Sequence, residues 1–239
     1  MRINTERKRI LKITALNTGV LFSGGKDSNL ALYYALKSTN VKCLIIIQSE
    51  NSESYMFHTP NIKWAKMQAK NMGIPAIVQK TKGVKEKELL DLEKAIKFAI
   101  RKYKINAVVT GAVESVYQAS RVQKIANKLD IECFNPLWQK DQIQLLKELI
   151  TLKFDVIIVG TFAYVLENFA GRKIDEKFIS DMLILRDKYK INPAGEGGEL
   201  ESFVLDAPFY KTKLSIKKSH VVKDAEGGRV LVIDSLEIP

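Results

Sequence analysis

The stretch Val20-Leu21-Phe22-Ser23-Gly24-Gly25-Lys26-Asp27-Ser28 decides the fold of this chain. An apolar run meets a turn rich in glycine and hydroxyl groups, and the helical pattern of residues 29–36 follows directly. Glycines in such a turn admit backbone N–H groups close to an anion, Ser23 and Ser28 add hydroxyl donors, and the helix directs its positive dipole end to the same point. The stretch therefore predicts a phosphate-binding loop between a strand and a helix.

This loop lacks the spacing of a Walker A motif. Counted back from Gly25-Lys26, the first glycine of that motif would fall on Val20 and its Ser/Thr on Asp27. The spelling instead resembles the PP-loop of the N-type ATP pyrophosphatases, which cleave ATP between the α and β phosphates. That resemblance implies ATP as a substrate bound by Ser23, Gly24, Gly25, Asp27 and Ser28. The alternative is a plain strand-to-helix turn with serine caps.

Composition is that of an ordinary globular protein. The 239 residues are 46% hydrophobic and 27% charged. No apolar run approaches the ~20 residues that cross a bilayer, and the basic N-terminus lacks the apolar stretch of a secretory signal. We therefore expect a cytoplasmic protein without a membrane partner.

The basic charge and the two cysteines bear on possible partners. A formal net charge of +11 favours an anionic partner such as RNA, but lysines and arginines are spread along the chain, so functional RNA binding is not expected. Cys43 and Cys133 lie in or beside apolar runs and form no C-x-x-C pair or zinc spacing. We expect both to be buried, which disfavours a thiolating enzyme that relies on paired cysteines.

The first half of the chain alternates short apolar segments with helical patterns. Strands are expected at 19–22, 44–47, 76–78 and 107–109, and helices near 28–38, 60–72, 86–103 and 115–129. This alternation predicts an α/β fold with a parallel sheet covered on both faces. Ligands bind beyond the carboxyl ends of such strands, so we expect the loops at 23–28, 48–54 and 110–115 to meet around one nucleotide.

The second half has a different character. A helix is expected at 141–151, a strand at 156–159, a helix near 175–190, and β-rich segments at 202–205 and 221–233, the last with a hairpin-like turn at 224–229. We therefore expect a smaller α+β domain that begins near Trp138, with the domains spanning 1–137 and 138–239.

Asp27 and Lys26 are candidates for catalysis at the loop. The Asp27 carboxylate cannot face phosphates favourably without a cation between them, and Mg²⁺ suits oxygen ligands shared with phosphates. The alternative for Asp27 is a cap of the following helix. Lys26 would neutralise charge on the departing pyrophosphate, or it is a surface lysine.

The segment Thr110-Gly111-Ala112-Val113-Glu114-Ser115 with Arg121 downstream supplies further candidates. Gly111 allows a close turn under a nucleotide, and Arg121 would pair with a phosphate in bidentate fashion. The alternative is a common strand-end turn followed by a surface arginine on a helix.

A glycine-rich acidic segment begins at Glu196 and continues through Glu199 and Glu201. If a strand starts near Glu199, then Glu199 and Glu201 point to the same face. Like charges this close are unfavourable unless a cation lies between them, and a quaternary ammonium, an ammonium ion or a metal would serve. The alternative is an exposed acidic turn before a strand.

Several segments together resemble one family, the diphthine ammonia ligases, or ATP-binding diphthamide synthases. They occur in the family's order, from about Gly19 to Pro239: Ser23–Tyr33, Tyr55–Asn61, Thr110–Ser115 with Arg121, Pro136–Trp138 and Glu196–Tyr210. The basic leader 1–17 lies outside the resemblance as an N-terminal extension. Leu200 and Ser202 stand where an aromatic residue and a threonine are common in the family.

The resemblance implies a HUP-type (Rossmann-like) ATP-binding domain and a smaller substrate-binding domain. It implies amidation of diphthine, a trimethylammonium-bearing histidine derivative on translation elongation factor 2, by ATP and ammonium, with AMP and pyrophosphate released through a carboxyl-adenylate. The implied catalytic residues are Lys26, Asp27, Glu196, Glu199 and Glu201, and the implied nucleotide contacts extend to Thr110, Gly111 and Arg121. The cofactor implied beside ATP is Mg²⁺, with Asp27 as its ligand.

Three other functions fit parts of the sequence. A PP-loop tRNA-modifying enzyme would share the nucleotide loop and explain the basic charge, but it would not explain the acidic segment. A non-catalytic nucleotide-binding regulatory module would need the loop alone. A glutamine-fed amidotransferase would need a cysteine with a histidine partner, and neither cysteine has an evident one, so free ammonium is the expected nitrogen source.

Overall fold

The computed structural model describes residues 16–51, 60–223 and 227–239. Their contacts divide the chain into two compact units. Unit 1 contains residues 16–22, 30–51 and 73–138, and unit 2 contains residues 23–29, 60–72 and everything described after 138. Within these residues, no helix is both long enough and apolar enough to span a membrane.

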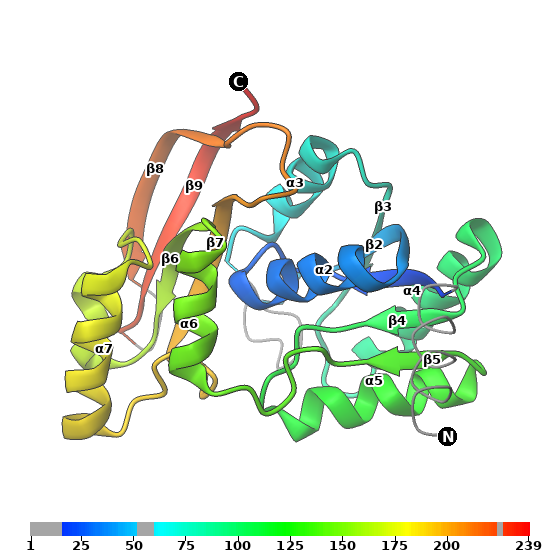
Figure 1. Ribbon diagram of the computed structural model, residues 1–239, viewed down its shortest axis with the longest axis horizontal. Coiled ribbons are helices and arrows are strands. Elements are labelled where there is room, and N and C mark those ends of the chain that lie inside the picture. Colours follow the sequence, from blue (N-terminus) through cyan, green and yellow to red (C-terminus); the bar gives the residue numbers. More distant parts are fainter. Residues whose placement is uncertain (1–15, 52–59, 224–226) are drawn as a thin grey trace, which may run out of the picture. The chain divides into compact units, whose positions relative to one another are not determined.

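Unit 1 is built on a five-stranded sheet in which every neighbouring pair is parallel. The strand order is β3-β2-β1-β4-β5, with bounds β1 (Asn17–Leu21), β2 (Asn40–Ser49), β3 (Ala76–Thr81), β4 (Ala107–Val109) and β5 (Glu132–Phe134) (Figure 1). The predicted α/β fold with a parallel sheet is confirmed. The short strand β5 was not expected from the sequence.

Helices cover this sheet because its strands are apolar on both faces. α4 (Glu88–Tyr103) and α5 (Val116–Lys128) pack in one buried cluster with alternate residues of β2, namely Cys43, Ile45 and Ile47. The intervening Leu44 and Ile46 are buried outside that cluster and so face the other side. α2 (Lys26–Ser38), the long blue helix of Figure 1, buries Leu30 and Leu32.

The cysteine prediction is confirmed in outline. Cys43 is fully buried, and Cys133 is half-buried. Burial raises the pKa of the Cys43 thiol to about 12 and that of the Cys133 thiol to about 11. Both thiols are therefore protonated near neutral pH and poorly nucleophilic.

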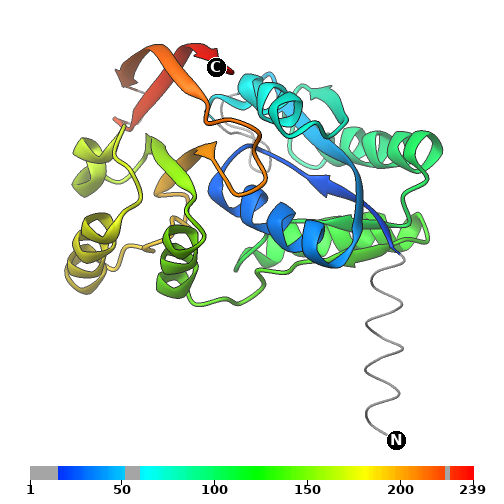
Figure 2. The same ribbon diagram turned by 45° about the horizontal axis from the view of Figure 1, so that its top comes forward.

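Unit 2 contains a four-stranded antiparallel sheet in the order β7-β6-β9-β8. Its strands are β6 (Asp155–Thr161), β7 (Leu200–Asp206), β8 (Ser215–Lys223) and β9 (Arg229–Glu237). Its helices include α6 (Gln142–Thr151) and α7 (Glu176–Tyr189), which lie side by side in Figures 1 and 2. Asp141 and Asp175 cap them by accepting backbone N–H bonds. The helices and β-rich segments predicted for the second half are present.

Shorter helical segments complete unit 2. They are η1 (Ile62–Trp64), α3 (Ala65–Met72) and η2 (Tyr164–Phe169). The Trp64 indole N–H donates to the Ile233 carbonyl at 2.9 Å, and the Asn61 side-chain amide donates to the Leu231 carbonyl at 2.8 Å. These bonds attach residues 61–64 to β9.

The two compact units and the two expected domains differ in part of their boundaries. Both change near Trp138, but contacts group the loop 23–29 and residues 60–72 with the second sheet. The domain boundaries 1–137 and 138–239 stay a prediction. Most of the leader 1–17, most of the 55–61 segment and part of the 224–229 turn lie outside the described residues.

Candidate functional site

The loop predicted to bind phosphate is a compact turn between β1 and α2. The Gly24 backbone N–H donates to the Ser28 hydroxyl oxygen at 3.2 Å, and that hydroxyl donates to the Gly25 carbonyl at 3.0 Å. The Ser23 hydroxyl lies 3.2 Å from the same oxygen. The hydroxyl groups of both serines therefore stabilise the conformation of the loop, in addition to their predicted role as donors to a phosphate.

Gly24 is required by both conformation and space. Its φ of +87° lies in the left-handed region. A Cβ at this position would lie 2.3 Å from the Gln68 Oε1. The Gln68 amide donates to the carbonyls of Gly24 at 3.1 Å and Val204 at 2.8 Å, so one buried side chain of α3 joins the loop to β7.

Two backbone contacts place β7 directly against the loop. The Lys26 N–H donates to the Ser202 hydroxyl at 3.0 Å, and the Val204 N–H donates to the Gly24 carbonyl at 3.1 Å. Downstream, the buried Tyr210 hydroxyl donates to Asn29 at 3.0 Å. Sequence reasoning missed Ser202 and Gln68 as partners of the loop. For Ser202 the only signal was its place inside the acidic segment.

Lys26 and Asp27 form a pair at the first turn of α2. The Lys26 Nζ lies 2.7 Å from the Asp27 Oδ2, and the lysine side chain is only 8% exposed. The Asp27 Oδ1 is buried and has no hydrogen-bond partner among the described residues. A buried carboxylate oxygen without a partner, directly after this loop, is suited to bind a cation such as Mg²⁺.

The charges of the acidic segment reach Lys26. Burial alone would lower the pKa of Lys26, but Asp27, Glu196 and Glu201 together outweigh burial, so that its pKa is raised. Burial raises the pKa of Glu201 to about 7; Lys26 opposes this increase, and Asp27 and Glu196 add to it. The structure thus brings two predicted segments, 26–27 and 196–201, into one electrostatic cluster.

Glu199 has a different environment from Glu201. Its carboxylate accepts bonds from the Asn192 amide at 2.8 Å, the Asn192 backbone N–H at 3.1 Å and the Gly197 N–H at 2.9 Å. These donors belong to its own loop, and β7 begins one residue later, at Leu200. The Glu199 carboxylate therefore fastens the loop 192–199, and its predicted catalytic role is untested.

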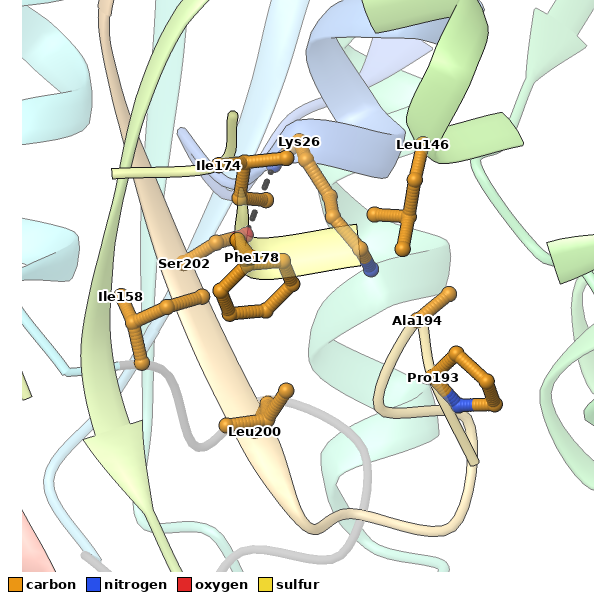
Figure 3. Close-up of a pocket in the computed structure, with 9 residues that line it drawn as sticks. All are labelled: Lys26, Leu146, Ile158, Ile174, Phe178, Pro193, Ala194, Leu200 and Ser202. Carbon is orange, nitrogen blue, oxygen red and sulfur yellow. Dashed lines mark hydrogen bonds between the residues drawn. The ribbon is translucent and has the colours of Figure 1, made fainter. Parts of the chain in front are cut away.

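A small pocket lies beside Lys26 within unit 2. Apolar side chains of α6, β6, α7 and residues 193–194 line it together with Ser202 and the Lys26 side chain. Figure 3 shows the Lys26 side chain running toward Leu146 and Ala194, while its backbone nitrogen faces the Ser202 hydroxyl. The stem of Lys26 is thus held by apolar contacts, and its ammonium is held by the Asp27 carboxylate.

Thr110, Gly111 and Arg121 belong to unit 1. The Thr110 hydroxyl donates to Asn135 and also accepts the Ala112 N–H at 3.2 Å, so it orders the turn after β4. The Arg121 guanidinium donates to Glu86 through Nε at 2.9 Å and stacks 3.3 Å from the centroid of the Tyr117 ring. Arg121 therefore has a carboxylate partner, and its predicted contact with a phosphate stays a prediction.

Asp27 is not part of a larger cluster of metal-binding side chains. Within the described part of the chain, no group of three or more His, Cys, Asp or Glu side chains is arranged to hold a metal ion. Asp27 alone would leave most of the coordination shell to phosphate oxygens and water, which is common for Mg²⁺.

The fold is α/β, and its first strand, β1, leads into a loop rich in glycine and serine. Strand β7 of the antiparallel sheet forms hydrogen bonds with this loop. Its sequence matches the diphthamide synthase N-terminal domain over residues 16–133 and the diphthamide synthase C-terminal domain over residues 141–236. The chain belongs to the diphthamide synthase family.

Several relatives in the family carry the same name. The diphthine–ammonia ligases of Homo sapiens and Bos taurus are each 29% identical to this chain, and each match covers 87% of this chain and 85% of the relative. The diphthine–ammonia ligase of Schizosaccharomyces pombe is 28% identical over 87% of this chain, but the match covers only 37% of that longer protein.

One solved structure, described as a predicted subunit of tRNA methyltransferase from Methanocaldococcus jannaschii, matches 81% of this chain and 98% of that chain. Its sequence identity is 19% and its TM-score is 0.42. A likeness this weak supports no conclusion about function.

Proposed function

We propose that this protein is a diphthine–ammonia ligase that amidates the carboxylate of diphthine on translation elongation factor 2. The observation that carries the proposal is the electrostatic cluster of Lys26, Asp27, Glu196 and Glu201, in which a nucleotide-type loop meets an acidic segment. Membership of the diphthamide synthase family supports the same conclusion. We place the reaction in the cytoplasm, where translation occurs.

The proposed reaction has two steps that balance. In the first, a carboxylate oxygen of diphthine attacks the α-phosphorus of ATP, and pyrophosphate leaves. In the second, ammonia attacks the acyl carbon of the carboxyl-adenylate, loses a proton, and AMP leaves. Adenylation is needed because a carboxylate oxygen is a poor leaving group until it is bound to phosphorus.

The loop residues would act on the departing pyrophosphate. Backbone N–H groups of the glycine turn and the hydroxyls of Ser23 and Ser28 are donors of the kind that stabilise phosphate charge. They bond within the loop in this structure, so phosphate binding would exchange the Gly24–Ser28 and Ser28–Gly25 bonds for bonds to phosphate oxygens. We propose that Asp27 holds Mg²⁺, which would supply positive charge to the phosphates when bound. Lys26 would add its own charge from a side chain already fixed by the pocket and by Asp27.

Three residues of unit 1 were also predicted to contact the nucleotide. We propose that Thr110 and Gly111 contact the nucleotide through the turn after β4, and that Arg121 pairs with a phosphate. Arg121 would then exchange its bond with Glu86 for a phosphate oxygen. Because the Glu86 side chain is more than half exposed, this exchange costs little.

The acidic segment would serve the acceptor and the nitrogen source. Glu196 and Glu201 carry the negative charge that a trimethylammonium group or an incoming ammonium needs. Glu199 would act indirectly, by holding the loop that carries Glu196 in shape. RNA binding, if measured, is expected to be non-specific and to fall steeply with salt.

The nucleotide products test this proposal. Protein, ATP, Mg²⁺ and ammonium are mixed with elongation factor 2 that carries diphthine, and the products are followed by ³¹P NMR. AMP and pyrophosphate should form, and their formation should depend on the modified factor. Formation of ADP and phosphate contradicts the proposal. If tRNA stimulates ATP cleavage and the factor does not, a tRNA-modifying function replaces it.

A further inference from the structure

A glycine on β6 leaves room for an aromatic ring beside Glu201. Gly160 of β6 pairs with Glu201 of β7 in the antiparallel register, and residues directly opposite each other direct their side chains to the same face of a sheet. A Cβ on Gly160 would lie 2.8 Å from Cε2 and 2.9 Å from Cζ of Phe162, and 3.0 Å from the Glu201 Cβ. The Phe162 ring and the Glu201 side chain therefore flank one position on the sheet.

Phe162 has a hydrogen-bonded backbone and a side chain that is partly exposed to solvent. Its backbone N–H donates to the Glu199 carbonyl at 2.9 Å, which ties the start of the segment after β6 to the acidic loop. Phe162 is 37% exposed, and Tyr164, two residues later, is 87% exposed. The two rings therefore give the segment after β6 an exposed aromatic surface, and the Phe162 ring lies over Gly160, which pairs with Glu201.

Glu201 supplies a charge with unusual properties. Burial makes its ionised form costly, and Asp27 and Glu196 add to this cost, whereas Lys26 reduces it. A cation placed against Glu201 would stabilise the ionised form. A bare ammonium ion satisfies its four N–H donors best with several oxygen acceptors, but a quaternary ammonium has no donor and binds best to an aromatic face near a carboxylate.

We propose that Phe162 and Glu201 form a binding site for a quaternary ammonium group, with the ring receiving the methyl groups and the carboxylate balancing the charge. The inference rests on the proposed function, because it assigns this site to the trimethylammonium of the diphthine acceptor. Gly160 is part of the site, since any side chain there would displace the ring. Ammonium is then assigned to Glu196.

A pair of matched probes tests the site without any turnover. Choline carries a trimethylammonium group, and 3,3-dimethyl-1-butanol is its uncharged isostere of nearly the same shape. Binding of each to the full-length protein is followed by saturation-transfer NMR. Choline should bind and the isostere should not. Equal binding of the two would show a merely hydrophobic patch and overturn the proposal.

Variants separate the ring from the charge. Phe162→Leu keeps an apolar side chain but loses the ring face, and it should weaken choline binding about tenfold, within the range of cation–π energies. Glu201→Gln should weaken binding similarly and remove its increase with pH near 7. Phe98→Leu, an exposed phenylalanine on α4, is the matched control and should change nothing. Thermal melts establish that each variant is folded.

The outcomes distinguish this inference from the proposed function. Unchanged choline binding in folded Phe162→Leu overturns the inference, as does complete displacement of choline by an equal concentration of ammonium chloride. If choline binds as described but the protein never amidates diphthine, the proposed function fails and the site stands. If amidation proceeds and Phe162→Leu leaves the KM for the diphthine-bearing factor unchanged, the function stands and the site fails.

Discussion

The backbone N–H of Lys26 donates to the Ser202 hydroxyl at 3.0 Å, although the two residues are 176 positions apart in sequence. Two residues further along β7, the Val204 N–H donates to the Gly24 carbonyl. β7 thus satisfies both a donor and an acceptor of the glycine loop. The conformation of the proposed phosphate site therefore depends on the segment that also carries the acidic residues.

Replacement of Ser202 tests this dependence. Ser202→Ala leaves the Lys26 N–H without its acceptor, and a buried unpaired donor costs about 1–3 kcal/mol of unfolding free energy. Urea denaturation measures the loss. Ser202→Thr keeps a hydroxyl and should lose less, and Ser219→Ala on the exposed strand β8 is the control. Equal stability of Ser202→Ala and the wild type would mean that water replaces the serine.

Gly24 and Gly198 allow the cost of backbone strain to be measured separately from the cost of steric crowding. Gly24 and Gly198 have φ values of +87° and +85°, but only Gly24 has a side chain within reach of an added Cβ. Gly198→Ala should lower the free energy of unfolding by about 1–2 kcal/mol, because alanine disfavours the left-handed conformation. Gly24→Ala should cost more, because it displaces Gln68 and breaks its bonds to Gly24 and Val204. Denaturation curves for both variants give the comparison; equal costs would contradict the crowding at Gly24.

Stability should depend on pH through Glu201. Its folded-state pKa of about 7 lies above the ordinary value of 4.5, so between these values the unfolded chain releases the proton first. The contribution of Glu201 to stability is then full below pH 4.5 and declines as pH rises to about 7. Between pH 4.5 and about 7, the free energy of unfolding of Glu201→Gln should exceed that of the wild type by up to about 3 kcal/mol.

Denaturation at several pH values measures that difference, with Glu132→Gln, an exposed glutamate of β5, as the control. A stability difference that stays flat from pH 4.5 to pH 7 would show that the Glu201 carboxylate ionises as it does in water.

Asp27→Asn tests the proposed magnesium ligand. The substitution keeps the size of the side chain and removes its charge, so Mg²⁺ should no longer tighten ATP binding in calorimetry, and turnover should be lost. A magnesium effect equal to that of the wild type would make Asp27 only a favourable charge at the start of α2, worth about 0.3–1 kcal/mol.

The fold could be predicted from the sequence where patterns are local. The alternation of apolar runs and helical periods located β1 to β4 and the helices between them, and Asp141 and Asp175 marked the starts of α6 and α7. β5 was missed because its three residues are too few to show a strand pattern, and it exists through its pairing with β4.

The site was predictable only within each segment. The loop 23–28 and the acidic segment are each visible in the sequence, but their meeting depends on how unit 2 folds. The period-two argument for Glu199 assumed that its strand begins there, whereas β7 begins at Leu200 and the loop holds the carboxylate. Similarly, no local pattern indicated that Glu86 binds Arg121.

Amidation of diphthine by this protein is tested most directly by the mass of the modified histidine. Purified protein is incubated with ATP, Mg²⁺, ¹⁵N-ammonium and elongation factor 2 that carries diphthine, and the modified peptide is examined by mass spectrometry. A diphthine–ammonia ligase should replace the carboxyl hydroxyl with a ¹⁵N-labelled amino group, only when ATP is present, with one AMP formed per amide. ATP cleavage to AMP without any labelled amide, or an unchanged peptide with folded and ATP-binding protein, would contradict it.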